Sequence, residues 1–223
     1  MQRLRIRYAK RGRLRFTSHR DFSRAFERAI FRAQVPMAYS SGFNPHPRIS
    51  YAGAAPTGSA SEAEYLEIAL AAVVDPAAIK TLLEEALPDG LDVLDVVESS
   101  GGSLADLLEA SRWRLDTTAD PAGLAAAVEA FLARDDVPVE RMTKKGLRTF
   151  NCRAAVLELT AHDARLDLLL RHEVPAVRPD DVLAGLRHVA GIETGEAPTL
   201  TRLAQGPLDV ETGAIGDPLT TRR

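Results

Sequence analysis

The strict alternation of residues 3 to 8 constrains the fold of this chain more than any other feature of its sequence. Arginines occupy the odd positions of this segment, and apolar side chains occupy the even ones. A period of two residues is typical of a β-strand that buries one face. The alternation resumes at residues 13 to 16, and a three-residue turn that ends in Gly12 would join the two segments into a hairpin. Arg7 would then face Arg15, which is an unfavourable pair unless an anion lies over it.

A helix is predicted directly after this hairpin. Ser18 is a typical N-cap residue, and Asp21 follows three positions later, as in a capping box. The apolar positions then recur with a helical period as far as Ala33. Arginines recur every four residues along another face of the same helix, at Arg20, Arg24, Arg28 and Arg32. Like charges at this spacing destabilise an isolated helix by roughly 0.2–0.5 kcal/mol per pair, so this face requires a counter-charge.

The remaining elements of the first half follow a recognisable order. After a turn-rich loop at residues 40 to 47, the pattern predicts two strands, a helix and a further strand, at residues 48–54, 63–71, 76–87 and 91–97. The complete order is strand, helix, strand, strand, helix, strand, which is the split βαβ or ferredoxin-like plan. We therefore expect an antiparallel sheet with both helices on one face and the other face free to bind.

A similar order recurs in the second half. Strands are predicted near residues 113–117, 137–143, 147–152, 165–171 and 199–204, with helices that begin after Asp120-Pro121 and at Pro179. The glycine- and serine-rich residues 99–105 are typical of a linker. The predicted fold class is therefore α+β, with two ferredoxin-like halves that have antiparallel sheets, at residues 1–98 and 106–206, and a loose tail at 207–223.

The basic residues of the chain are concentrated near its start. The first 50 residues contain 12 of the 28 lysines and arginines but only two of the 31 aspartates and glutamates, so their net charge is +10. The other 173 residues contain 16 basic and 29 acidic side chains, a net charge of −13. A local field of this size indicates a polyanionic partner, most simply RNA. The alternative is internal pairing, either with the acidic second half or with Glu62, Glu64 and Glu67 of the predicted third strand.

Composition excludes several classes of enzyme. The single cysteine, Cys152, cannot ligate an iron–sulfur cluster, and together with His162 and His172 it has neither the number nor the spacing of a structural zinc site. The chain has no Gly-x-Gly-x-x-Gly motif after a strand and no Gly-x4-Gly-Lys-Ser/Thr motif, which are the two nucleotide-binding fingerprints. We therefore expect no cofactor and no metal. The longest plain apolar run, residues 68 to 74, is too short to span a bilayer. The single cysteine and the lack of an apolar leader indicate a cytoplasmic protein without membrane contact.

Three motifs of the first half resemble those of a known family, and the GFNPHP run is the specific one among them. They are FTSHRD at residues 16–21, GFNPHP at residues 42–47, and the set Gly58, Ser61, Glu64 and Tyr65. Together they resemble the radical-SAM-linked domain family, a bacterial family of unknown function whose members lie beside, or are fused to, a radical SAM protein. The basic segment from Lys144 to Arg153 resembles the corresponding strand of that family more weakly. The chain departs from the family pattern at Arg20, where leucine is usual, and at residues 55–58, where the turn is usually more apolar.

The resemblance implies a partner rather than a reaction of this chain. A radical SAM enzyme holds its cluster with three cysteines, so this chain, which has one, would act together with a separate radical SAM protein. Our first hypothesis is an RNA-binding accessory protein that presents structured RNA, either tRNA or rRNA, to such a modification enzyme. It requires no catalytic residue. The residues predicted to bind RNA are Arg3, Arg5, Arg7, Arg13, Arg15, Arg20, Arg24, Phe43, Asn44, His46 and Arg48.

Two alternatives stay open. Tandem ferredoxin-like folds with a glycine-containing loop resemble the metal-independent endoribonucleases that process CRISPR transcripts, in which case His19 and His46 would serve as base and acid. The protein could instead be an adaptor whose basic face docks on an acidic surface of the radical SAM partner. If RNA is the ligand, Phe43 and one neighbouring tyrosine, Tyr39 or Tyr51, are the candidates for stacking against bases.

Overall fold

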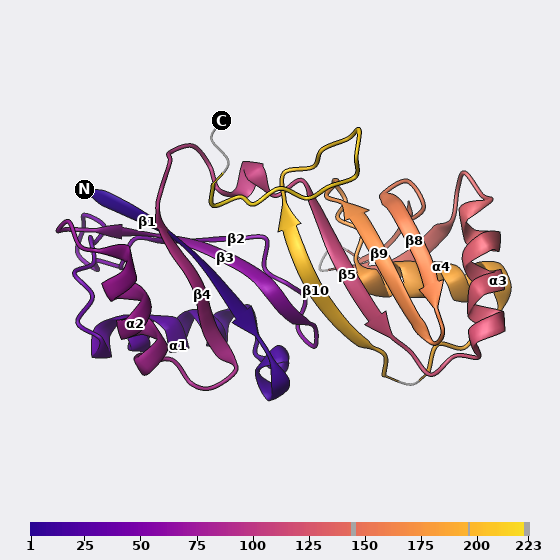
Figure 1. The fold of residues 1–223 in the computed structure, drawn as a ribbon, viewed down its shortest axis with the longest axis horizontal. Coiled ribbons are helices and arrows are strands. Elements are labelled where there is room, and N and C mark those ends of the chain that lie inside the picture. The colour runs from indigo at the N-terminus through magenta and orange to yellow at the C-terminus, as the bar shows by residue number, and fades with distance from the viewer. Residues whose placement is uncertain (144–145, 196, 221–223) are drawn as a thin grey trace. The chain divides into compact units, whose positions relative to one another are not determined.

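The computed structural model describes residues 1–143, 146–195 and 197–220. The chain forms two compact units. The first consists of Met1–Leu108 and the residues from Gly216 onward, and the second consists of Glu109–Ile215. Both combine α-helices with antiparallel strands, so the predicted α+β class is confirmed (Figure 1). Lys144 and Lys145, which begin the basic segment of the second half, lie outside the described residues.

The first unit follows the predicted order of strands and helices. Its elements are β1 (Gln2–Lys10), η1 (Gly12–Phe16), α1 (His19–Arg32), β2 (Ile49–Ala52), β3 (Ala60–Leu70), α2 (Pro76–Ala86), β4 (Leu91–Glu98) and η2 (Ala105–Leu107), where η denotes a 3-10 helix. The strands lie in the order β4-β1-β3-β2, and every neighbouring pair is antiparallel. This is the strand order of a split βαβ plan.

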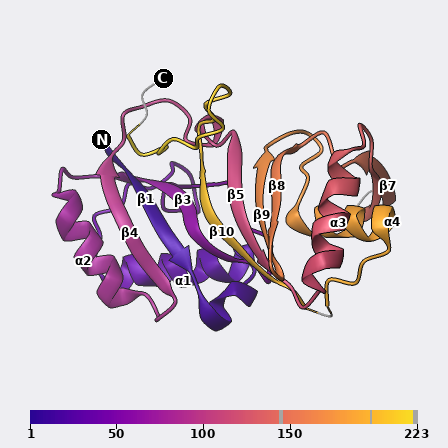
Figure 2. The same ribbon diagram turned by 45° about the vertical axis from the view of Figure 1, so that its right-hand side comes forward.

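The helices α1 and α2 cover one face of this sheet (Figures 1 and 2). α1 begins where Ser18 accepts a hydrogen bond from the backbone N–H of Asp21, as the sequence predicts, and Asp75 caps α2 in a similar way. The apolar face of α1, which includes Phe22 and Phe26, packs with apolar side chains of β1, β3 and α2 in the main core of the unit. The other face of α1 consequently points to solvent.

The predicted hairpin between residues 3–8 and 13–16 is wrong. β1 forms as expected, with its apolar positions in the core, but residues 12–16 form the 3-10 helix η1. Both edges of β1 are already occupied, because β3 pairs with one edge and β4 with the other. Arg7 consequently lies opposite Tyr65 and Asp95 rather than opposite Arg15.

The second face of this sheet is covered, contrary to the expectation that it is free to bind. Leu104, Leu108 and Leu219 pack in one cluster with buried side chains of β2 and β3. The residues predicted as a linker, 99–105, therefore belong to the first unit, and so does the part of the predicted tail from Gly216 onward. Burial of these leucines removes apolar surface from water and so stabilises the packing of both segments on the sheet.

The second unit repeats the plan with one addition. Its elements are β5 (Ala110–Asp116), α3 (Pro121–Leu132), β6 (Pro138–Thr143), β7 (Gly146–Asn151), β8 (Val156–His162), β9 (Arg165–Arg171), α4 (Pro179–Ala190) and β10 (Thr199–Gly206). The main sheet has the order β10-β5-β9-β8, and all its pairs are antiparallel. β6 and β7 form a separate hairpin, and α3 packs against α4 (Figure 2).

β8 was not among the predicted strands, although Leu157, Leu159 and Ala161 alternate with Glu158, Thr160 and His162. A register shift between Val156 and Glu158 lies at the start of this strand. The predicted bounds of the neighbouring strand β9 are confirmed. Within the described residues, none of the helices combines the length and the apolar character needed to cross a membrane.

Candidate nucleic-acid interface

The arginines on the sheet are paired with acidic groups of the same unit. Arg3 contacts the Glu67 carboxylate, with 3.2 Å between Nη1 and Oε1. Arg7 donates from Nε to the backbone carbonyl of Glu62 at 2.9 Å, and its Nη1 lies 3.8 Å from an oxygen of Asp95. For these residues the alternative of internal pairing describes the structure better than a free phosphate-binding ribbon.

Arg5 is the extreme case, because its side chain is fully buried. Its Nε lies 3.3 Å from Oε2 of Glu67, and its Nη2 donates to the backbone carbonyls of Gly101 at 2.5 Å and Gly102 at 3.3 Å. Its Nη1 donates to the carbonyl of Pro218 at 3.4 Å. The prediction that Arg5 binds RNA is therefore incompatible with this structure, because its buried guanidinium already bonds to Glu67 and to the segments that cover the sheet.

Arg11 is paired in the same manner near the end of β1. Its guanidinium bonds to the carboxylates of Glu62 and Asp92, the latter at 2.7 Å. These bonds, chiefly the one to Glu62, raise the pKa of the Arg11 guanidinium above its usual value. Arg15 is half-buried instead, with its guanidinium carbon 4.7 Å from the centre of the Phe16 ring, whereas Arg13 is exposed.

The arginines on α1 are exposed. The face opposite the buried side of the helix carries Arg20, Arg24, Arg28 and Arg32. Within the part of the chain that the structure describes, none of the four forms an ion pair. Phe31 lies three residues after Arg28 and is 83% exposed, so it shares this face. We call these five residues the arginine face of α1.

Three members of this face were missing from the predicted set of RNA-binding residues. The period of four residues was visible in the sequence for Arg28 and Arg32, and it placed them beside the predicted residues Arg20 and Arg24. Phe31 gave no such signal, because an aromatic residue in an amphipathic helix usually belongs to the core. Its exposure follows from its angular position, which lies between those of the arginines rather than with Phe22.

The GFNPHP loop is held at its base and open at its tip. The backbone N–H of Ser40 donates to the carbonyl of His46 at 2.9 Å, and the N–H of His46 donates to Oγ of Ser40 at 3.0 Å. Phe43 and Asn44 lie between these two residues and are exposed, Phe43 completely so. The loop therefore presents an aromatic ring to solvent, as the sequence predicts for a stacking residue.

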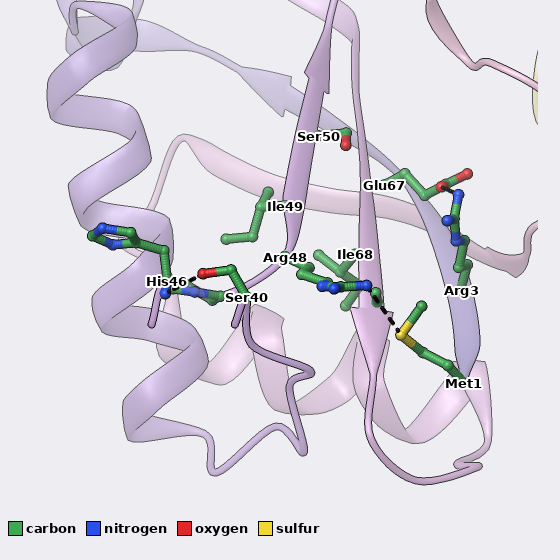
Figure 3. Close-up of a pocket in the computed structure, with 11 residues that line it drawn as sticks. Met1, Arg3, Ser40, His46, Arg48, Ile49, Ser50, Glu67 and Ile68 are labelled. Atoms are coloured by element: carbon green, nitrogen blue, oxygen red, sulfur yellow. Dashed lines mark hydrogen bonds and ion pairs between the residues drawn. The ribbon is translucent and has the colours of Figure 1, made fainter. Parts of the chain in front are cut away.

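A groove with a volume of about 360 Å³ lies beside this loop (Figure 3). Its lining includes Met1, Arg3, Ser40, His46, Arg48 and Glu67. Arg48 is exposed, and its Nη1 lies 3.8 Å from the sulfur of Met1. Phe43 and Asn44 do not line the groove. The groove thus gathers residues that are far apart in the sequence, from β1, the loop and β3.

The two histidines of the nuclease alternative lie in different surroundings. The ring of His19 contacts Tyr51 edge to face, at 4.9 Å between centroids, and His19 does not line the groove. Burial raises the pKa of Tyr51, which also packs against Phe22. Figure 3 shows the imidazole of His46 on the side away from Arg3 and Arg48. Among the described residues, no three His, Cys, Asp or Glu side chains are placed to hold a metal ion.

These observations define an α+β protein with antiparallel sheets, in which α1 exposes a row of arginines. Residues 3–179 match a family described as an uncharacterized protein conserved in bacteria (DUF2344). Because this match covers more than half of the chain, the chain belongs to that family. None of the curated proteins matches it.

Proposed function

We propose that the protein binds RNA through the arginine face of α1 and presents it to a radical SAM modification enzyme. The observation that carries the proposal is the contrast between two sets of arginines in one unit. The arginines of β1 are satisfied by carboxylates and carbonyls of the same unit. Those of α1 have no acidic partner among the described residues and face solvent.

The spacing of the arginine face suits a nucleic-acid backbone. Successive arginines are four residues apart, so the row from Arg20 to Arg32 extends for about 18 Å along the helix axis. Phosphates neutralise such a row and remove the repulsion between like charges at i and i+4. Phe31 stands among the guanidinium groups, and an exposed aromatic ring beside arginines can stack against an unpaired base.

The partner in this proposal rests on the sequence motifs rather than on the arginine face. The resemblance to the radical-SAM-linked domain family suggests that the RNA is a substrate of a separate radical SAM enzyme, and that it is a structured RNA such as tRNA or rRNA. Cytoplasmic location is part of the same proposal, and the single cysteine of the chain is compatible with a reducing compartment.

The salt dependence of RNA binding tests the arginine face. We expect replacement of Arg20, Arg24, Arg28 and Arg32 by glutamine to weaken RNA binding and to flatten its dependence on salt. Each phosphate contact to a single strand contributes about 0.7 to the slope of log affinity against log salt, so four lost contacts reduce that slope by up to about 3. Affinities of both proteins for labelled RNA at several salt concentrations provide the measurement.

A matched variant separates a specific face from net charge. Arg112, Arg114, Arg165 and Arg187 lie in the second unit, and each forms an ion pair there. Their replacement by glutamine changes the net charge of the protein by the same amount as the α1 variant. We expect this control to keep the affinity and the salt slope of the unmodified protein. An equal loss in both variants would refute the assignment to α1.

A further inference from the structure

We propose that the groove beside the GFNPHP loop holds one nucleotide of the RNA, with Arg48 bound to its phosphate. This inference rests on the proposed RNA binding and names a second contact for it. The groove volume of about 360 Å³ lies in the range of roughly 300–1,000 Å³ that is usual for small-molecule sites. It is therefore large enough for a mononucleotide unit.

The charges at the groove favour an anion. Glu67 is the carboxylate in its lining, and both of its oxygens are engaged, by Arg3, by Arg5 and by the hydroxyl of Ser99 at 2.7 Å. Three arginines, counting Arg48, thus accompany a single carboxylate. The local excess of two positive charges has no other ion-pair partner in the portion of the chain that is described.

Arg48 is the side chain best placed to accept a new ligand. Its Nη1 lies 3.8 Å from the sulfur of Met1. A thioether is a weak acceptor, and a phosphate oxygen can replace it. Its backbone is fixed on both sides, since its N–H donates to Ala38 at 2.9 Å and its carbonyl accepts from Ala69 at 3.0 Å. Figure 3 shows Arg48 on the same side of the groove as Arg3 and Met1.

The rest of the lining matches the other parts of a nucleotide. Ser40 and Ser50 place hydroxyls there, and a hydroxyl can donate to a phosphate or ribose oxygen. Pro47 and Ile49, both half-buried, supply apolar surface on which a sugar or base can lie. Because the described lining contains no phenylalanine, tyrosine or tryptophan and the cations dominate it, we expect recognition of the phosphate with little preference among bases.

Adenosine monophosphate and adenosine are suitable probes of the groove. We expect the purified protein to bind adenosine monophosphate at millimolar concentration, and adenosine at least about tenfold more weakly because it lacks the phosphate. Arg48→Gln removes the charge at an exposed position and should weaken binding of the monophosphate by about tenfold or more. Arg187→Gln removes an exposed arginine of the second unit, outside the groove, and should leave binding of the monophosphate unchanged. Calorimetric titration measures all four affinities, and circular dichroism verifies folding.

The outcomes separate this inference from the proposed function. Equal binding of the monophosphate by the Arg48→Gln variant and the unmodified protein would overturn the groove, as would the absence of any binding. In either case the RNA affinity and its dependence on the α1 arginines could still be intact. Conversely, monophosphate binding that is lost in Arg48→Gln, in a protein with no affinity for RNA, would support the groove and refute RNA binding.

Discussion

Arg3, Arg5 and Arg7 share one face of β1, yet only Arg5 is fully buried. Burial of an unpaired guanidinium carries a large desolvation free energy. Here a carboxylate and several carbonyl oxygens accept hydrogen bonds from the Arg5 guanidinium and offset that penalty. Glu67 depends on the same pairing, because its side chain is only 10% exposed. Arg5 is therefore a structural residue, which fastens residues 99–102 and Pro218 to the sheet.

Replacement of Arg5 by methionine should destabilise the first unit strongly. It leaves the Glu67 carboxylate without its buried partner and removes the donor to three carbonyls, and loss of one member of a buried pair typically costs about 3–5 kcal/mol. Arg13→Met is the control, since Arg13 is exposed and its loss should change stability by no more than about 0.5 kcal/mol. Urea unfolding followed by circular dichroism measures both, and similar midpoints would contradict the assigned role.

For single residues, the sequence indicated which face of β1 lies in the core, but not which arginine of the opposite face is buried. The alternation of residues 3 to 8 correctly separated Leu4 and Ile6 from the arginines. The burial of Arg5 depends on Gly101 and Pro218, which are remote from it in the chain. A local pattern contains no information about such partners, so Arg5 and its exposed neighbour Arg3 look equivalent in the sequence.

Gly185 lies where α4 packs closely against its neighbours. A Cβ atom on Gly185 would lie 2.8 Å from Cε2 of Phe131 on α3 and 2.9 Å from Sγ of Cys152. Both distances are shorter than van der Waals contact. Glycine at this position therefore lets α4 pack tightly against α3 and the segment that follows β7.

Gly185→Ala should destabilise the second unit by about 1–2 kcal/mol, because the cost of overpacking exceeds the gain in helix propensity. Gly123→Ala is the matched control in α3, where the nearest atom would lie at 3.4 Å, and it should leave stability unchanged or raise it slightly.

Burial raises the pKa of the Cys152 thiol to about 12, so this thiol reacts at pH 8 mainly when the unit opens. Alkylation of Cys152 should accelerate in Gly185→Ala and not in Gly123→Ala. The reverse order would contradict the packing argument.

Helices were predicted more accurately than strands, for a physical reason. Ser18, Asp75 and Asp120 cap their helices through hydrogen bonds to residues two or three positions away, and the sequence shows such pairs directly. Strands need partners that the local pattern does not reveal. The alternation at residues 13–16 was read as a strand, although both edges of β1 were taken. β8 was not predicted, although Leu157, Leu159 and Ala161 alternate there with polar residues.

For the whole molecule, the sequence indicated a basic region and the structure divides that region into two parts. The +10 charge of the first 50 residues pointed to a polyanion. It could not show that the sheet arginines are paired, whereas the α1 arginines have no acidic partner among the residues that the structure describes. The candidate site therefore consists of the arginine face of α1 and the groove beside the GFNPHP loop, rather than the predicted hairpin of residues 3–8 and 13–16. Of the residues predicted to bind RNA, Arg20, Arg24, His46 and Arg48 are exposed, whereas Arg5 is buried.

The proposed partnership predicts a phenotype in cells. Deletion of the gene for this protein, or of the gene for its radical SAM partner, should remove the same modification from the same RNA. A copy with the four α1 arginines replaced should fail to restore that modification, and the variant with four replaced arginines in the second unit should restore it. Mass spectrometry of nucleosides from tRNA and rRNA is the measurement. An unchanged modification profile after deletion would contradict the accessory role.

The first unit is interrupted in sequence by the whole of the second, from Glu109 to Ile215. β1 is synthesised before the residue that supplies one acceptor of the Arg5 guanidinium, the carbonyl of Pro218. At about 5–20 residues per second, the intervening residues of the second unit take roughly 5–20 s to translate. The arginine-rich first unit therefore acquires its final cover, which includes Leu219, only after the whole of the second unit has been synthesised.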